Sequence, residues 1–104
     1  DALKQVMLIL LDNALKHSSG DIDILTEKTE TEIQISVRDY GDGIPPETLA
    51  HIFDRFYRGE ESTITPGFGL GLPIAKALVE GMGGEIEIES EEGQGSIVIL
   101  IFTL

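Results

Sequence analysis

The 104-residue chain contains no cysteine, which excludes a disulfide framework and a cysteine-based zinc site. Long apolar runs are also missing: the longest cover residues 6–11 and 97–102, well short of the roughly 18 residues that a membrane-spanning helix needs. No basic flank precedes a longer apolar run at the N-terminus, so the pattern of a signal peptide is absent. We therefore expect a cytoplasmic domain without direct membrane contact, which leaves room for a membrane anchor elsewhere in the full-length protein.

Basic residues are scarce, because 7 Lys and Arg stand against 19 Asp and Glu and the formal net charge is −12. Nucleic-acid binding rests on cationic side chains that neutralise phosphates, so the composition argues against nucleic acid as a partner. The same charge opposes the binding of a nucleotide polyphosphate. Such a ligand would need local help from backbone N–H groups, a few placed cations and a metal ion.

What the chain does contain is an ordinary globular composition, with 41% hydrophobic residues in a length that suits one domain, residues 1–104. Apolar residues recur at three- and four-residue steps in two segments, which predicts helices over residues 2–17 and 70–82. A short helix is predicted over residues 46–52, because proline suits a first helical turn.

Alternating apolar and polar residues predict two pairs of strands, each pair joined by a turn. The strands are expected at residues 22–24, 33–37, 85–89 and 96–104. Glycine and proline make residues 39–46 a loop, and residues 59–69 lack apolar periodicity and are predicted to form a surface loop. The order helix, strand, strand, helix, helix, strand, strand predicts an α/β two-layer sandwich, with a mixed, mainly antiparallel sheet and helices on one face.

The first segment with chemical potential is residues 10–17, LLDNALKH, where Asn13 and Lys16 are three positions apart and share one helix face. A carboxamide in an apolar stretch costs free energy unless it has partners. Mg²⁺ accepts an amide oxygen together with water and phosphate oxygens, and the Lys16 ammonium can meet a phosphate. The alternative, commoner for such a pair alone, is that Asn13 bonds to a loop backbone and Lys16 is solvated.

A second segment, residues 39–45, reads DYGDGIP and follows a predicted strand. Gly41 and Gly43 lack side chains, so the backbone there can approach a flat ligand closely. Asp39 can accept a hydrogen bond from the exocyclic amine of adenine, and Ile44 can pack on the face of the ring. The alternative is a tight turn with aspartate as a turn residue.

Two further segments carry arginines and glycines. Residues 52–59, IFDRFYRG, interleave aromatic residues at the spacing of core anchors with Arg55 and Arg58, either of which can reach a terminal phosphate or form a surface ion pair. Residues 67–72, GFGLGL, lead into the second long helix, whose free N–H groups and positive dipole end favour phosphate. No strand directly precedes this run and no Gly-Lys-Ser/Thr closes it, so a flexible hinge is the alternative.

Taken together and in this order, the segments closely resemble the catalytic domain of sensor histidine kinases, within the superfamily that includes DNA gyrase and the mismatch-repair ATPases. The matching segments are the N box at residues 12–17, the first glycine box at 39–43, the F box at 53–57, the second glycine box at 67–72 and the final hairpin at 93–96. The resemblance covers essentially the whole chain. It implies the left-handed βαβ sandwich known as the Bergerat fold, with ATP and Mg²⁺ as ligands.

The resemblance also implies a role for each matching residue. Asn13 would hold Mg²⁺, Lys16 and His17 would approach the phosphates, and residues 59–68 would form the ATP lid. The candidate catalytic residues are Asn13, Lys16 and Arg58, with Arg55 as the alternative to Arg58 for the contact with phosphate. The full set expected around the nucleotide is Asn13, Lys16, His17, Asp39, Gly41, Gly43, Ile44, Tyr57, Gly67, Gly69, Leu70, Gly71, Leu72 and Ser96.

One position departs from the family pattern. A second asparagine usually stands four residues before Asn13, where this chain has Ile9. Ile9 cannot coordinate a metal or orient water, which predicts lowered metal affinity or rate. Gyrase-like ATPases carry a glutamate base there, so Ile9 argues against efficient hydrolysis and favours transfer of the γ-phosphoryl group to a histidine.

The acceptor histidine of this family lies on a separate, N-terminal dimerisation domain, and neither His17 nor His51 resembles it. The expected partners are therefore that dimerisation and phosphoacceptor domain and, through it, a response regulator. The chain alone should bind ATP and Mg²⁺ without autophosphorylation. Two alternatives remain open: a serine kinase of the same superfamily, and a nucleotide-sensing or scaffolding domain without transfer activity.

Overall fold

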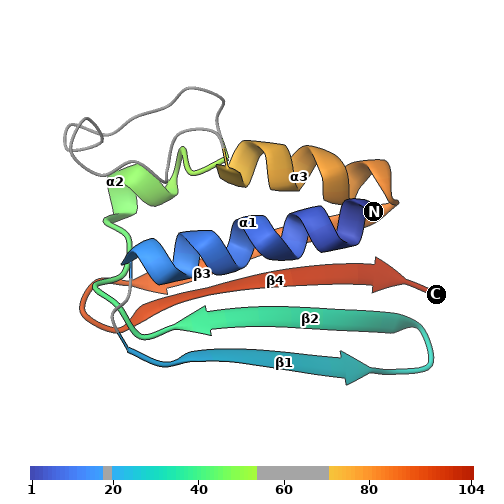
Figure 1. Ribbon diagram of the computed structural model, residues 1–104, viewed down its shortest axis with the longest axis horizontal. Helices are drawn as coiled ribbons and strands as arrows, with labels where there is room; N and C mark the ends of the chain where they lie inside the picture. The colour runs from blue at the N-terminus through green and yellow to red at the C-terminus, as the bar shows by residue number, and fades with distance from the viewer. Residues whose placement is uncertain (18–19, 54–70) are drawn as a thin grey trace.

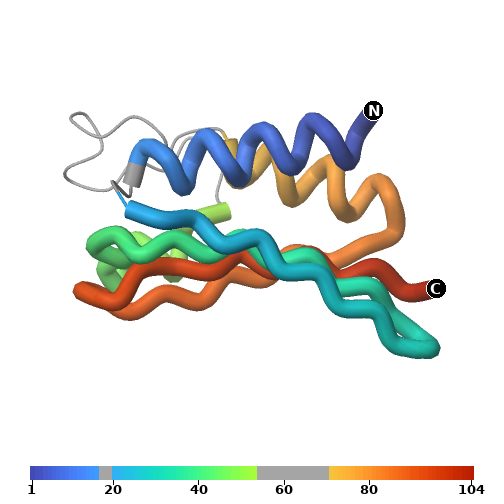
Figure 2. The backbone as a smooth tube through the Cα atoms, turned by 60° about the horizontal axis from the view of Figure 1, so that its bottom comes forward, coloured from blue at the N-terminus to red at the C-terminus, as the bar shows by residue number. Residues whose placement is uncertain are grey.

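The computed structural model describes residues 1–17, 20–53 and 71–104. Its helices are α1 (Ala2–His17), α2 (Pro46–Leu49) and α3 (Gly71–Gly81), and its strands are β1 (Ile22–Lys28), β2 (Glu32–Asp39), β3 (Gly84–Glu91) and β4 (Gly95–Thr103). The helices form one layer over one face of the sheet, and the two chain ends lie at the same end of the molecule (Figures 1 and 2). None of the helices in these residues combines the length and hydrophobicity needed to cross a bilayer.

The sheet has the strand order β1-β2-β4-β3, and each neighbouring pair is antiparallel. Because β4 opposes both of its neighbours, β2 and β3 run in the same direction with β4 between them. The predicted two-layer α/β sandwich is confirmed, although no parallel pairing of the kind that a mixed sheet requires occurs among the described strands. Asp39, at the end of β2, therefore lies opposite Ser96 at the start of β4.

Most predicted elements are found with small shifts at their ends, but the helix predicted over residues 46–52 is wrong beyond Leu49. The amides of His51 and Ile52 bond to carbonyl oxygens only three residues back, at 3.0 and 3.3 Å, which is the pattern of a tighter turn. The second long helix starts at Gly71 and ends at Gly81. It stops where Gly83 adopts φ +81°, a conformation that glycine takes without strain. The loop predicted at 59–69 lies outside the described residues.

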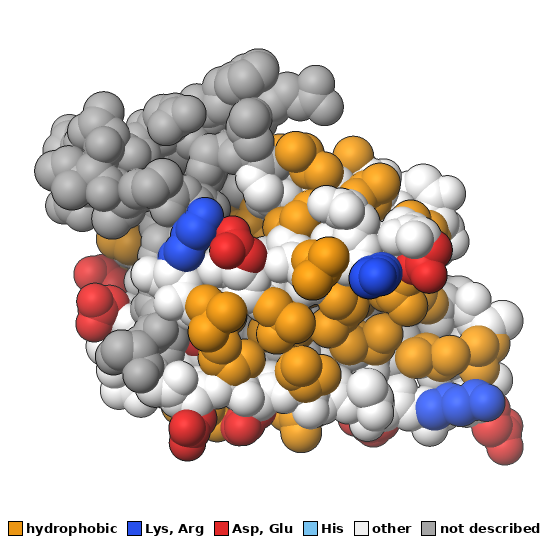
Figure 3. Space-filling model, in the orientation of Figure 1, with side chains coloured by type: hydrophobic (Ala, Val, Ile, Leu, Met, Phe, Trp, Pro, Cys, Tyr) orange, Lys and Arg blue, Asp and Glu red, His pale blue; other side chains and the backbone are white. Residues whose placement is uncertain are grey.

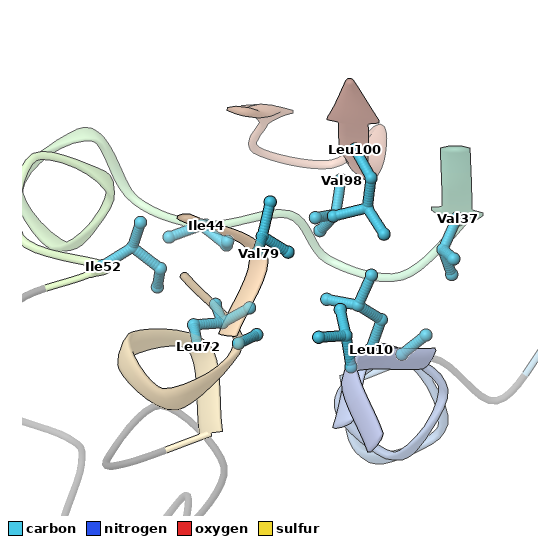
Figure 4. Packing of buried hydrophobic residues seen from close by; sticks show 11 residues of the cluster. Leu10, Val37, Ile44, Ile52, Leu72, Val79, Val98 and Leu100 are labelled. Atoms are coloured by element: carbon cyan, nitrogen blue, oxygen red, sulfur yellow. The ribbon is translucent and has the colours of Figure 1, made fainter. Parts of the chain in front are cut away.

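The hydrophobic core lies between the helix layer and the covered face of the sheet (Figure 4). Leu10 of α1, Leu72 and Val79 of α3 and Leu100 of β4 have at most 2% of their surface exposed. Each such side chain contributes roughly 1.5–3 kcal/mol when it is fully buried. The periodic apolar residues that predicted α1 and α3 are thus the residues that hold both helices on the sheet.

An apolar surface remains uncovered beside α1. Leu8 and Leu15 of α1 and Ile24 of β1 are 53%, 65% and 51% exposed. Apolar side chains gather between α1 and the strands below it in the space-filling view (Figure 3). This surface follows from α1 packing mainly on α3 and β2, which leaves the helix-side face of β1 open.

Candidate functional site

The predicted nucleotide-binding segments that the structure describes lie at one end of the sandwich. The last turns of α1, the end of β2, the loop after it and the β3–β4 turn occur at the left in Figure 1, and α3 begins beside the middle of α1, where Gly71 lies near Ile9. Segments from distant parts of the sequence therefore meet at this end, as the resemblance to an ATP-binding domain requires.

Asn13 carries the most unusual atom of this region. Its side-chain oxygen Oδ1 is buried and has no hydrogen-bond partner among residues 1–17, 20–53 and 71–104. Buried acceptors nearly always find partners in folded proteins, because an unpaired one costs free energy. An amide oxygen held in this way fits a hard cation such as Mg²⁺, which prefers oxygen ligands. Within residues 1–17, 20–53 and 71–104 no group of three or more His, Asp or Glu side chains is placed to hold a metal ion.

Lys16 lies one turn further along α1, at the surface. Its Nζ atom is 3.0 Å from Oδ2 of Asp12, and the two side chains are 46% and 64% exposed. An exposed ion pair of this kind contributes little to stability, so the ammonium can exchange its partner at small cost. The structure describes the backbone of His17 as the last residue of α1 but leaves its side chain undescribed.

Asp39 is the buried carboxylate of the site, with 7% of its surface exposed. Its Oδ1 atom accepts a hydrogen bond from the amide of Gly41 at 3.0 Å, which ties the carboxylate to the loop that follows β2. Ile44, by contrast, is 3% exposed and its side chain packs within the core, so the loop is anchored by Ile44 at its far end.

The loop after β2 is bonded to the β3–β4 hairpin. The amide of Gly93 donates to the carbonyl of Asp42 at 2.7 Å, and the amide of Ile44 donates to the hydroxyl of Ser90 at 2.7 Å. A Cβ atom added at Gly43, where φ is +77°, would overlap the carbonyl oxygen of Glu91. Gly43 is thus required by the close approach of two protein segments, in addition to the approach of a ligand that the sequence suggested.

Ser96 and Ser90 form the polar part of the hairpin. Ser96 is paired with Asp39 across the β2–β4 ladder and with Ser90 across the β3–β4 ladder, so all three side chains point to the helix-covered face. The two hydroxyl oxygens are 3.1 Å apart. Sequence analysis identified Ser96 but missed Ser90. The signal was available, because alternation places Ser90 on the same face as the half-buried Ile86 and Ile88.

The N-terminal turn of α3 lies against α1. An added Cβ at Gly71 would be 3.4 Å from the side chain of Ile9, so Ile9 packs at the start of α3. Leu72 is fully buried. The side chain of Ile9, the position at which the sequence departs from the expected family pattern, therefore contacts the start of α3, which is predicted to bind phosphate.

The remaining predicted residues lie outside the described part of the chain. They are Tyr57, Arg58, Gly67, Gly69, Leu70 and the lid at residues 59–68. Their roles stay predictions. The F box is represented by Phe53, which is half-buried and packs on the core, with Nζ of Lys76 5.4 Å from its ring centroid.

Tyr40 has a titration that can be tested. Its hydroxyl donates to Asp23 at 2.5 Å, and this hydrogen bond raises the pKa of Tyr40. The neutral phenol is favoured by folding, so its contribution to stability is present below the pKa of about 10 of an unfolded tyrosine and is lost as pH rises through the folded value. In a Tyr57→Phe background, which leaves Tyr40 as the only tyrosine, absorbance titration should give a midpoint above that of free tyrosine. Asp23→Asn should lower the titration midpoint of Tyr40, and equal midpoints with Asp23 and with Asn at this position would contradict the hydrogen bond.

Comparison with known proteins identifies the family. Residues 1–104 match the family described as histidine kinase-, DNA gyrase B- and HSP90-like ATPases. The sensor histidine kinase YkoH of Bacillus subtilis is 42% identical over 105 residues, with 99% of this chain and 23% of that protein covered. The sensor protein CiaH of Streptococcus pneumoniae is 40% identical over 99 residues, covering 91% and 22%. The chain thus spans about a fifth of the length of these curated relatives.

Solved structures agree with the sequence matches. The catalytic domain of the histidine kinase ThkA, in a nucleotide-free form, superimposes with a TM-score of 0.81 at 33% identity, over 98% of this chain and 67% of that one. Full-length ShkA, crystallised with AMPPNP, gives a TM-score of 0.80 at 30% identity, over 96% and 21%. The chain belongs to the family of histidine kinase-, DNA gyrase B- and HSP90-like ATPases, and its relatives in that family are sensor histidine kinases.

Proposed function

We propose that this domain binds ATP together with Mg²⁺ and donates the γ-phosphoryl group to a histidine on a separate dimerisation and phosphoacceptor domain of a cytoplasmic signalling module. The observation that carries the proposal is the buried Oδ1 atom of Asn13, which finds no partner in the part of the chain that the structure describes and stands at the position that matches the family's N box. A fold that retains an unpaired buried acceptor gives up stability, and a bound ion or water is a recognised explanation for such an atom.

The described residues divide the work of binding. Asn13 would hold Mg²⁺, which when bound draws phosphate oxygens together and offsets their charge. Asp39 would accept a hydrogen bond from the adenine amine on the carboxylate oxygen that does not bond to Gly41. The start of α3 offers its backbone N–H groups to phosphate, and Lys16 can leave Asp12 to meet a phosphate oxygen. Such local groups explain how a chain of net charge −12 can bind a polyanion.

Transfer follows from position more than from acid–base chemistry. The bond between the γ-phosphorus and its bridging oxygen breaks, a bond from an imidazole nitrogen of the acceptor to that phosphorus forms, and ADP leaves. An imidazole nitrogen attacks with its own lone pair, so no strong base from this domain is needed. The acceptor domain would then pass the phosphoryl group to a response regulator.

Calorimetric titration of the domain with a non-hydrolysable ATP analogue, with and without Mg²⁺, tests the binding step. We expect a dissociation constant in the micromolar range that rises about tenfold or more when Mg²⁺ is removed, since each factor of ten corresponds to about 1.4 kcal/mol. A titration without heat of binding in either condition would overturn the proposal.

A second function is favoured by Ile9. Its apolar side chain packs against the start of α3, where the family carries an amide, so the domain would bind nucleotide as a sensing or scaffolding module without transfer. The two functions differ when radiolabelled ATP and the dimerisation domain of the full-length protein are supplied. Labelled acceptor supports the kinase, whereas binding without label supports the module.

A further inference from the structure

We propose that Ser90, on β3, is a positioning residue that fixes Ser96 as a hydrogen-bond acceptor and thereby makes the base site select a 6-amino purine over a 6-oxo purine. The inference rests on the proposed nucleotide-binding function and deepens it. Ser90 carries no role in the sequence motifs, yet its hydroxyl contacts the loop after β2, the hairpin turn and Ser96.

The three contacts of the Ser90 hydroxyl determine where its hydrogen points. The amide of Ile44 donates to Ser90 Oγ at 2.7 Å, which uses one lone pair. The carbonyl of Gly95 lies 3.1 Å away and can only accept, so the Ser90 hydrogen must point to it. The Ser96 oxygen is also 3.1 Å away. With the Ser90 hydrogen already committed, this last contact is a hydrogen bond only when Ser96 donates.

Only this arrangement makes all three contacts hydrogen bonds. If Ser90 donated to Ser96 instead, its oxygen would face the Gly95 carbonyl at 3.1 Å with no hydrogen between them. Two acceptors in contact repel, and the cost rises away from bulk water. Ser90 thus accepts two bonds and donates one. Ser96 has used its only hydrogen and presents lone pairs alone to whatever lies beside it.

Ser96 lies directly opposite Asp39 in the ladder, on the helix-covered face. The carboxylate of Asp39 and the oxygen of Ser96 are both acceptors at the same level of the sheet. A 6-amino group, with two hydrogens, satisfies acceptors. In a 6-oxo purine the exocyclic group is itself an acceptor, so the protein oxygen that would meet the amine meets a second acceptor, which is the more costly mismatch at a site built for hydrogen bonds.

Ser90→Ala frees the hydrogen of Ser96, which can then rotate and donate to a 6-oxo group. It also removes the acceptor of the Ile44 amide, which loosens the loop after β2. The domain would be titrated, with Mg²⁺, against the β,γ-imido analogues of adenosine and inosine triphosphate. We expect the adenosine analogue to bind about tenfold more weakly and the inosine analogue to change by less than about twofold, as the loss of one part-buried hydrogen bond predicts. The dissociation constant of the inosine analogue divided by that of the adenosine analogue would therefore fall about tenfold.

A purely structural role of Ser90 would weaken both analogues by the same factor, and that result, or an unchanged ratio, would overturn the proposal. Ser36→Ala is the matched control, because Ser36 lies on the same sheet but alternates to the opposite face from Val37. If Ser90→Ala does not fold, Ser90→Thr and Ser90→Val replace it, since they share a shape and differ in the hydroxyl. Ser90→Thr should keep the wild-type ratio of the two dissociation constants, whereas Ser90→Val should lower the preference for the adenosine analogue as Ser90→Ala does. A wild-type domain that binds neither analogue overturns the proposed function itself, whereas wild-type binding without base preference overturns this inference alone.

Discussion

Asn13→Leu is expected to make the domain more stable and, at the same time, to abolish the Mg²⁺ dependence of its nucleotide binding. Leucine has the same number of side-chain heavy atoms as asparagine, branched at the same carbon, but has no oxygen to leave unpaired. Removal of the orphaned Oδ1 atom should raise the free energy of unfolding by about 1 kcal/mol, and Tm by roughly 4–8 °C for a domain of this size. Thermal unfolding without ligand measures the first effect.

The same variant loses the amide oxygen that would hold the metal ion. Its dissociation constant for a non-hydrolysable ATP analogue should be the same with and without Mg²⁺, where the wild type differs about tenfold or more. Gln5→Leu is the matched control: it makes the same amide-to-leucine change at an exposed position of α1 and should leave the Mg²⁺ dependence unaltered. A destabilised Asn13→Leu that still responds to Mg²⁺ would show that Asn13 is a structural residue.

The elements of this fold were predictable where a single periodicity dominates. The helical repeat over residues 2–17 coincides with α1, because the same apolar residues that make the pattern fill the core. The prediction failed at α2, which ends at Leu49. There a proline start and a few apolar residues suggested two turns of helix, but backbone bonds to the third residue back form a tighter turn instead.

The site was predictable in its conspicuous residues and not in its supports. Asn13 and Asp39 stand out in the sequence, since one is a polar group in an apolar helix and the other precedes a glycine-rich loop. Ser90 does not stand out, because its partner Ile44 is 46 residues away and no local pattern reports that contact.

Gly95→Ala is expected to have the largest effect on stability of any substitution in the hairpin. Gly95 adopts φ +99°, and an added Cβ would overlap the carbonyl oxygen of Asp39 and lie 2.9 Å from Cα of Tyr40. Backbone strain and overpacking each cost about 1–3 kcal/mol, so we expect a loss of about 3–5 kcal/mol from a total that is typically 5–15 kcal/mol. Chemical denaturation would measure it, and Tm should fall by roughly 15–30 °C.

Gly93→Ala separates the two causes, because Gly93 has a similar φ of +83° in the same turn but nothing within 4 Å of an added Cβ. This variant carries the backbone term alone and should lose about 1 kcal/mol. The difference between the two alanine variants is then the cost of pushing the hairpin away from the end of β2. Because that push displaces the backbone of Asp39, Gly95→Ala should also weaken the binding of an adenosine analogue at temperatures where it stays folded, while Gly93→Ala should not. Equal losses in the two variants would mean that the hairpin does not hold Asp39 in place, and the base site would then owe its geometry to the loop after β2 alone.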